Sequence, residues 1–417
     1  MPLVFVILDG AADRKSESLG WATPLQSAYM PNLRQISFLS LKGMMYPIKE
    51  GVAPESDAAV FSILGYDISS YTGRGPLESF GAGLKVTDGS VAFRCNFATI
   101  GKNREIIDRR AGRIDTHDAK ALEKEINRIH LGVEGVRFKF KSTVGHRGVC
   151  VFYSKESLSA NVSNADVGYI REGNISVAVQ EGSGALPRVM PLDESEGAKN
   201  TAKIANIFID KTIEILPHAQ VNRERLGKGL LQANAVLMRD CGVGLPRVNT
   251  FESRHGMKCA FVAEMPVEIG IAKLLGMVPI RLRQMKNRKK RYRKMAELVR
   301  DNINNYGFIY VHIKGPDEPG HDGDAILKKK ILEEIDSSFF SVIRGLKADI
   351  CVTCDHSTPC TLKAHSGDPV PVMVRYSHSD KSDGMPFDEY IGSTGSLGVI
   401  MGNQLIDNII SGESDGR

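Results

Sequence analysis

The chain has 417 residues, of which 42% are hydrophobic and 25% charged, and its formal net charge is +5. The length allows two domains, or one large domain that carries an insertion. The composition is that of a globular protein with an ordinary core, which excludes a disordered chain. The small positive charge is compatible with an anionic substrate but does not by itself indicate nucleic-acid binding.

Targeting and membrane signals are missing from the sequence. No apolar run reaches the roughly 18 residues that a transmembrane helix needs. The N-terminal run MPLVFVILDG lacks a basic start and ends in Asp9, so it predicts a strand rather than a signal peptide. The seven cysteines are widely spread and odd in number, unlike a disulfide framework. We therefore expect a cytoplasmic protein without a membrane partner.

Two different patterns of hydrophobic residues occur along the chain. Near-continuous apolar runs alternate with amphipathic segments in the first part and again from about residue 195, which predicts a doubly wound, mostly parallel α/β sheet. Residues 85–170 instead suggest a strand, a helix and a hairpin that turns at Gly145. We predict a discontinuous α/β domain of residues 1–78 and 172–417, with an α+β cap domain of residues 79–171 inserted in it.

Seven candidate metal ligands stand at five places, four of which follow or adjoin a predicted strand. They are Asp9, Ser56, Asp317, His321, Asp355, His356 and His365. Enzymes of the α/β class place their chemistry at the carboxyl ends of parallel strands. A single aspartate or serine at such a place is often only a helix cap. Together, carboxylate and imidazole ligands beside one serine predict a two-metal site that activates a hydroxyl against phosphate.

Two of these places carry local predictions. Asp317 and His321 are four residues apart, which would bring them to one side of a helical turn. The prolines and glycines around them favour a tight loop over a regular helix. Ser56 opens a predicted short helix of residues 56–65, whose free N–H groups would stabilise a phosphate attacked by the serine.

Basic residues gather at three further places. The predicted cap contains a concentration of anion-binding donors, in Arg94, the DRRAGR segment at residues 108–113 and the pair His146–Arg147. A solvated basic face is the alternative interpretation of these residues. Lys314 directly precedes the Asp317 segment and could neutralise a phosphate oxygen. The run KNRKKRYRK at residues 286–294 has one interleaved aromatic residue, so a solvated helix start or an active-site loop is favoured over nucleic-acid binding.

Long motifs in the chain resemble a known family. They are VILDG, APESDAA, LGYD, YTGRGPLESFGAG, VAFRCNFAT, DRRAGRI, GHRGV, VNRERLGKGL, VHIKGPDEPGHDGD and CDHSTPCTLKAHSGDPVP. Nearly end to end, the chain is similar to the archaeal-type, cofactor-independent phosphoglycerate mutases of the alkaline phosphatase superfamily. The resemblance implies an alkaline phosphatase-like fold and two divalent metal ions. Manganese is expected, with magnesium, zinc and cobalt left open, and no 2,3-bisphosphoglycerate is required.

The resemblance also implies a role for each candidate residue. One metal would be held by Asp317, His321 and His365, and the other by Asp9, Ser56, Asp355 and His356. Ser56 would become phosphorylated, with Lys314 and Arg110 as further catalytic residues. The substrate-binding shell would comprise Arg94, Asp108, Arg109, Arg110, His146 and Lys314.

The implied reaction is an isomerisation in glycolysis and gluconeogenesis. Ser56 would take the phosphoryl group of 3-phosphoglycerate, and the bound glycerate would turn and take it back on its 2-hydroxyl. The expected partner is therefore a small phosphorylated carboxylate, with no nucleic acid, and a homo-oligomer stays open.

The sequence departs from the family pattern at three places. Around the serine the family commonly reads Gly-Ser-Asp-Thr-Ala-His, whereas Glu55, Ala58 and Val60 stand here. A Thr-Asp-Pro-His segment is matched by Ala-Asp-Val-Gly at residues 165–168, and a Gly-Ala-Thr-Gly-like loop by the basic segment near residues 284–290. These changes leave open a related phosphotransferase or phosphohydrolase that acts on another small hydroxyl compound, such as a homoserine kinase-like enzyme. A non-catalytic metal- or RNA-binding protein is a further alternative.

Overall fold

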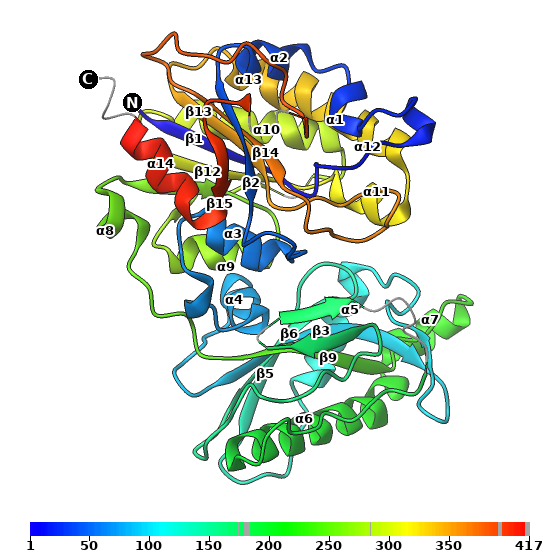
Figure 1. The fold of residues 1–417 in the computed structure, drawn as a ribbon. Coiled ribbons are helices and arrows are strands. Elements are labelled where there is room, and N and C mark those ends of the chain that lie inside the picture. The colour runs from blue at the N-terminus through cyan, green and yellow to red at the C-terminus, as the bar shows by residue number, and fades with distance from the viewer. Residues whose placement is uncertain (174, 179–183, 284, 391–393, 413–417) are drawn as a thin grey trace. The chain divides into compact units, whose positions relative to one another are not determined.

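The computed structural model describes residues 1–173, 175–178, 184–283, 285–390 and 394–412 (Figure 1). Gln284, at the start of the basic segment that departs from the family pattern, lies outside these residues. Contacts divide the chain into two compact units. The first unit comprises Met1–Ser70 and Val248–Arg417, and the second unit comprises Tyr71–Arg247.

The first unit is built on one large sheet. Its strands are β1 (Leu3–Leu8), β2 (Leu41–Tyr46), β10 (Cys259–Val262), β11 (Val278–Pro279), β12 (Phe308–Ile313), β13 (Asp349–Cys354), β14 (Val370–Arg375) and β15 (Gly398–Met401). Among the described residues they lie in the order β11-β10-β12-β1-β13-β14-β2-β15. Neighbours run parallel except where β14 pairs with β13 and with β2. The predicted mostly parallel α/β fold class is therefore confirmed.

Helices cover both faces of this sheet (Figure 1). One group that packs together is α1 (Pro24–Ser27), α2 (Pro31–Ser37), α10 (Arg288–Asn302), α12 (Ala325–Ile335), the π-helical turn η4 (Asp336–Phe340) and α13 (Ser341–Ile343). The other is α3 (Ser56–Ile63), α9 (Pro266–Leu274), the 3₁₀ turn η6 (Gly402–Gln404) and α14 (Leu405–Gly412). Because both faces are covered, β1, β12 and β13 are buried along their whole length, as near-continuous apolar runs predict.

The second unit has an antiparallel sheet. Its strands are β3 (Val91–Ile100), β4 (Ile106–Asp108), β5 (Arg137–Ser142), β6 (Arg147–Tyr153) and β9 (Ala235–Val243), beside the separate pair β7 (Tyr169–Glu172) and β8 (Ile175–Ala178). Its helices are α4 (Arg74–Gly81), α5 (Thr116–Ile126), α6 (Glu196–Ile215) and α7 (Gln220–Gly227). The predicted hairpin is present, since β5 pairs with β6 around Gly145. An aromatic core that includes Phe97, Phe140 and Phe208 lies between the sheet and α6.

The boundaries of the two units differ from the predicted cap of residues 79–171. Residues 172–247 belong to the second unit, because β9 pairs with the central strand β3 and α6 packs on the same core. The N-terminal boundary moves to Tyr71, because α4 covers the opposite face of this sheet. In sequence, α6 and β9 look like a continuation of the α/β alternation, and a strand pairing over more than a hundred residues leaves no local signal.

The segment that begins at Asp317 was expected to be a tight loop, and this expectation is wrong. It forms the short helix α11 (Asp317–Asp322), which starts directly after Pro316 and ends at Gly323 with a φ of 80°. Pro319 is tolerated because it lies in the first turn, where backbone N–H groups have no intrahelical partner.

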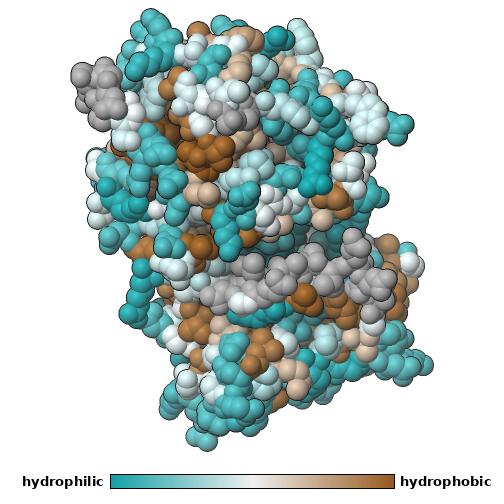
Figure 2. Space-filling model, in the orientation of Figure 1, coloured by the Kyte–Doolittle hydropathy of each residue, from teal (hydrophilic) through white to brown (hydrophobic). Residues whose placement is uncertain are grey.

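The described surface offers no sign of a membrane-spanning helix. No helix among the described residues combines the length and apolar character that crossing a bilayer requires. Hydrophilic residues cover most of the face in Figure 2, and hydrophobic residues form smaller groups among them.

Candidate active site

Three neighbouring strands of the first unit end in one row. The register aligns the last residues of β1, β12 and β13, so the residues that follow, Asp9, Lys314 and Asp355, leave the sheet side by side. Asp9 and Asp355 are buried, and Lys314 Nζ lies 2.8 Å from Asp9 Oδ1. The predicted meeting of these side chains at the carboxyl edge of the sheet is therefore present.

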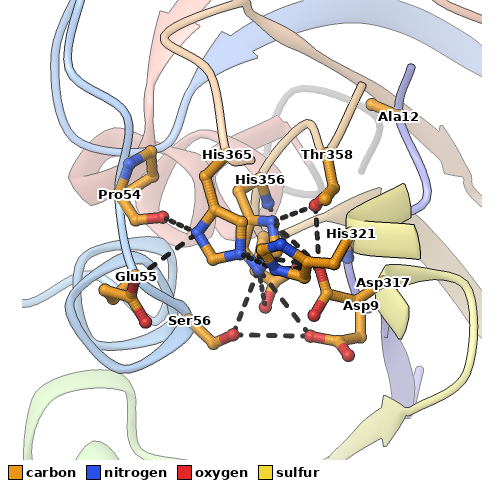
Figure 3. Close-up of polar contacts among 12 residues, drawn as sticks. Asp9, Ala12, Pro54, Glu55, Ser56, Asp317, His321, His356, Thr358 and His365 are labelled. Carbon is orange, nitrogen blue, oxygen red and sulfur yellow. Dashed lines mark hydrogen bonds and ion pairs between the residues drawn. The ribbon is translucent and has the colours of Figure 1, made fainter. Parts of the chain in front are cut away.

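Ser56 joins this row from the first turn of α3 (Figure 3). Its hydroxyl Oγ lies 3.4 Å from Asp9 Oδ1 and 3.1 Å from His356 Nε2. The side chain is 7% exposed, so it is largely shielded but not sealed from solvent. Free N–H groups of the first helical turn favour negative charge beside the serine.

A hydrogen-bond chain orients His356. Its Nδ1 lies 2.9 Å from Thr358 Oγ1, and that hydroxyl donates to Asp317 Oδ1 at 2.7 Å. The Thr358 hydroxyl therefore accepts from Nδ1–H, which leaves the Nε2 lone pair of His356 facing Ser56, Asp9 and Asp355. Such an outer hydrogen bond is how proteins fix the tautomer of a metal-binding histidine.

His321 and His365 are oriented in the same way. The Nδ1 of His321 lies 3.2 Å from the Lys363 carbonyl, and that of His365 lies 2.8 Å from the Pro54 carbonyl. Their Nε2 atoms lie 3.1 Å apart, and each is 3.5 Å from Asp317 Oδ1 (Figure 3). Because both Nδ1–H groups donate to carbonyls, this contact requires either a proton on one Nε2 atom or a cation between the two.

The site carries more negative than positive charge. Burial and the neighbouring Asp9 raise the pKa of Asp355 to about 7, and Asp355 Oδ2 has no hydrogen-bond partner among the described residues. Burial lowers the pKa of His365, but Asp317 and Glu55 outweigh burial and raise it to about 10. Both shifts show a place that stabilises added positive charge.

Within this site, two groups of side chains present ligand atoms close enough to share an ion. One is Asp9, Asp355 and His356, and the other is Asp317, His356 and His365. His321 completes the second group through the distances given above. Carboxylate oxygens and imidazole nitrogens suit divalent metals such as manganese or zinc, so these groups support the binding of divalent metal ions.

The sequence prediction missed two buried ionisable residues beside Lys314. Glu268 on α9 places Oε1 2.7 Å from Lys314 Nζ, and His312 on β12 places Nε2 3.6 Å from Asp9 Oδ1 and 3.7 Å from Glu268 Oε1. Both are 1% exposed. The available signal was a glutamate among the apolar residues that open the helix sequence PVEIGIAKL.

A buried ion pair holds together the segments that carry the ligands. Lys328 on α12 donates to Asp13 Oδ2 at 2.8 Å, to the Ala12 carbonyl and to the Thr358 carbonyl. Asp13 also accepts from the backbone N–H of Cys360. This pair joins three parts of the chain: the segment after β1, the segment after β13 and helix α12. It therefore fixes the spacing between them.

Gly10 is required by the site. Its φ is +57°, and a Cβ there would lie 2.7 Å from both Asp317 Oδ1 and Thr358 Oγ1. The glycine of the VILDG motif therefore admits the Asp317 carboxylate beside the end of β1.

Residues that depart from the family pattern around Ser56 fall into two kinds. Ala58 and Val60 are buried on α3 and face the core. Glu55 instead lies near the site, with Oε1 3.9 Å from His365 Nδ1. Glu55 therefore adds a carboxylate beside a proposed ligand.

In the second unit, strand register gathers the arginines. Arg94 on β3 pairs with Arg239 on β9, and Asn96 pairs with Arg147 on β6, so the three guanidinium groups lie on the sheet face that α4 covers. Glu78 on α4 meets Arg94 at 3.5 Å. The sequence prediction named Arg94 but missed Arg239 and Glu78.

His146 lies within this positive cluster. Burial and the charges of Arg147, Arg110 and Arg94 lower the pKa of His146 to about 3, so the imidazole is neutral at neutral pH. Arg110 itself is exposed, and its backbone N–H bonds the Asp108 carboxylate at 2.6 Å. The structure thus brings Arg94, Arg110 and His146 together, while Asp108 shapes the turn that carries Arg110.

Arg109 has a different environment. Its guanidinium binds the buried carboxylate of Asp166 at 2.7 Å, and Arg239 binds the other oxygen at 2.8 Å. A Cβ at Gly168 would lie 2.2 Å from this Arg109 guanidinium. Glycine at position 168, where the family has histidine, is therefore what leaves space for the Arg109 side chain.

The basic run at residues 286–294 contains the start of helix α10, and several of its basic side chains form ion pairs with glutamates. Arg288 pairs with Glu334, Arg291 pairs with Glu264, and Arg293 pairs with Glu297. Tyr292 is fully buried, and its hydroxyl donates to the Lys314 carbonyl at 2.8 Å. The aromatic residue of this run thus supports the backbone of the site and is not available for stacking on bases.

Comparisons with known proteins show the family to which the chain belongs. The sequence model of the family described as 2,3-bisphosphoglycerate-independent phosphoglycerate mutase matches residues 39–222. A protein of that name from Aeropyrum pernix is 39% identical over 97% of this chain and 98% of its own length. A 2,3-bisphosphoglycerate-independent phosphoglycerate mutase 1 from Methanocaldococcus jannaschii is 38% identical over 97% and 95%.

Solved structures show the same similarity. The cofactor-independent phosphoglycerate mutase from Thermoplasma acidophilum is 29% identical, with a TM-score of 0.64 over 98% of this chain and 99% of that one. The PH0037 protein from Pyrococcus horikoshii is 26% identical, with a TM-score of 0.75 over 98% and 96%. The fold is thus that of a phosphoglycerate mutase-like α/β protein. The chain belongs to the 2,3-bisphosphoglycerate-independent phosphoglycerate mutase family.

We predict that Asp317→Asn lowers the metal content of purified, manganese-loaded protein from about two ions per chain to about one, because an amide is a weaker ligand than a carboxylate. Elemental analysis after gel filtration measures the content. Asp380→Asn, which removes an exposed carboxylate of the same unit, should leave it unchanged. An unchanged content in Asp317→Asn would contradict the ligand assignment.

Proposed function

We propose that this protein is a cofactor-independent phosphoglycerate mutase that interconverts 3-phosphoglycerate and 2-phosphoglycerate through a phosphoserine at Ser56. The observation that carries the proposal is the position of the Ser56 hydroxyl among two groups of metal-ligand atoms. Membership of a family whose members are named for this reaction supports the choice of substrate.

Two divalent ions fit the residues present. Asp9, Ser56, Asp355 and His356 would hold one ion, and Asp317, His321 and His365 the other. The orphaned Asp355 Oδ2 and the facing Nε2 atoms of His321 and His365 favour this occupancy. When bound, the ions act as Lewis acids that lower the pKa of a coordinated hydroxyl and offset phosphoryl charge. We expect manganese, with magnesium, zinc and cobalt as alternatives.

The residues of the chain then perform a double transfer. Ser56 Oγ loses its proton and attacks the phosphorus of 3-phosphoglycerate, and the 3-oxygen of glycerate leaves and takes up a proton. The bound glycerate turns so that its 2-hydroxyl attacks the phosphoserine, which restores the serine hydroxyl. Lys314 and the N–H groups of the first turn of α3 offset the charge on the transferring phosphoryl oxygens.

The second unit supplies the substrate-binding residues in this proposal. Arg110 is the exposed guanidinium of the cluster, so it is the one best placed to take the carboxylate in a bidentate pair. His146, held neutral, can donate to a hydroxyl of glycerate. Arg94 is paired with Glu78, and Arg109 with Asp166, so in this proposal both contribute positive charge and bind the substrate less directly than Arg110. Asp108 holds the turn that carries Arg110.

We predict that mutase activity depends on divalent metal and not on 2,3-bisphosphoglycerate. Protein stripped of metal with a chelator should be inactive, and reloading with manganese should restore the conversion of 3-phosphoglycerate to 2-phosphoglycerate. The formation of 2-phosphoglycerate is measured in an assay coupled to enolase. Release of inorganic phosphate without 2-phosphoglycerate would contradict the proposal and indicate a phosphohydrolase.

We predict that Ser56→Ala abolishes turnover and prevents formation of the phosphoprotein. The free energy of unfolding should change by no more than about 1 kcal/mol, since the serine hydroxyl caps no backbone group in the structure. Quenched-flow mass spectrometry of the Ser56 peptide detects the phosphate. Ser62→Ala, on the same helix, is the matched control and should retain turnover. Appreciable turnover by Ser56→Ala would exclude the phosphoserine mechanism.

We predict that Arg110→Lys raises KM for 3-phosphoglycerate about tenfold, because an ammonium cannot replace the guanidinium fork and loses one charged hydrogen bond of about 1.5 kcal/mol. Steady-state kinetics measure the change. Arg113→Lys alters an exposed arginine of the same DRRAGR turn and should leave KM unchanged. Equal kinetics in both variants would mean that Arg110 is only a surface charge.

A further inference from the structure

Glu268 is a buried acid that neither group of metal ligands includes. It lies on α9, whose other buried residues are apolar or glycine, and it is 1% exposed. An isolated carboxylate in such a place is costly unless a cation pairs with it. The cation is Lys314, whose Nζ lies 2.7 Å from Glu268 Oε1.

The Lys314 ammonium is thus held between two carboxylates. Its Nζ lies 2.8 Å from Asp9 Oδ1 and 2.7 Å from Glu268 Oε1, and His312 Nε2 lies within 3.7 Å of both oxygens. Asp9 is a proposed metal ligand, so its carboxylate would be shared between a bound metal and Lys314. Glu268 belongs to neither ligand group, so its carboxylate would pair with Lys314 without competition from a metal.

The backbone of Lys314 is fixed independently. Its carbonyl accepts the hydrogen bond from Tyr292, and Gly315, with a φ of +143°, brings the chain so close that a Cβ there would lie 2.4 Å from the Tyr292 hydroxyl. The long side chain is the part that retains rotational freedom. Glu268 therefore acts on the end of the lysine that carries the charge.

We propose that Glu268 is a positioning residue that holds the Lys314 ammonium in place for phosphoryl transfer. The inference rests on the proposed function, since it assigns Lys314 a role in stabilising the transferring phosphoryl group. Misplacing a charged group by about 1 Å can cost on the order of 100-fold in rate. Loss of Glu268 should therefore lower kcat more than it changes KM or metal content.

The test is a double-mutant cycle on manganese-loaded, full-length protein. Glu268→Gln should lower kcat for 3-phosphoglycerate about 10- to 100-fold, with KM and the content of two metal ions preserved. In a Lys314→Met background the same substitution should cause no further loss, because the group through which it acts is gone. Glu268→Asp, which keeps the charge but withdraws it by one methylene, should show a smaller loss and serves if the Gln variant folds poorly.

A matched control separates positioning from stability. Asp349→Asn removes another buried carboxylate, at the opposite end of β13, where it accepts from the backbone N–H and hydroxyl of Ser377. It should lower the thermal unfolding midpoint without lowering kcat. If Glu268→Gln behaved in the same way, the positioning role would be refuted.

The remaining outcomes are distinct. Loss of metal in Glu268→Gln would make Glu268 a part of the metal site and overturn the inference. An equal fall in kcat with and without Lys314 would show that Glu268 acts on something else. Full activity in Lys314→Met would remove both the role of Lys314 and this inference while leaving the mutase in place. A wild-type protein without mutase activity would instead refute the proposed function.

Discussion

The structure of the first unit depends on a concentration of buried carboxylates at one edge of its sheet. The buried Asp9 and Asp355 and the half-buried Asp317 converge there, and the Lys314 ammonium pairs with Asp9 and with the buried Glu268. Buried negative charge of this density is costly unless cations offset it. The Lys314 ammonium offsets part of this charge by pairing with Asp9 and Glu268. The three histidines are oriented so that their Nε2 atoms can bind cations beside the carboxylates.

The site is therefore prepared by groups that would not touch the substrate. Thr358 and two backbone carbonyls set the tautomers of the histidines, while the buried Lys328–Asp13 pair ties together the segments that carry them. Such outer contacts hold ligands within the narrow geometry that metal binding and phosphoryl transfer require. In the second unit the same principle holds, because Asp166 fixes Arg109 and Arg239.

Much of the first unit could be predicted from sequence, because each strand of a buried parallel sheet has a local signal in the sequence. Buried strands read as apolar runs, and the residues after β1, β12 and β13 had to meet once those strands were neighbours. Glu268 could not be found in this way, since its helix joins the site only in three dimensions. The limits of the second unit were missed for the same reason: β9 pairs with a strand more than a hundred residues earlier.

The departures from the family pattern have physical explanations that the sequence alone did not offer. Gly168 makes space for the Arg109 guanidinium, and Glu55 adds a carboxylate beside His365. Just after the third departure, Tyr292 donates a hydrogen bond that supports the backbone of Lys314. Of these departures, Glu55 is the one that lies beside a proposed ligand, and the ligand residues stay in positions from which they can bind an ion.

Anomalous X-ray diffraction from crystals grown with manganese would locate any ions held by the seven converging residues. Two anomalous peaks are expected in the first unit. One should contact Asp9, Ser56, Asp355 and His356, and the other should contact Asp317, His321 and His365. A single peak, or peaks that Ser56 does not contact, would contradict the account.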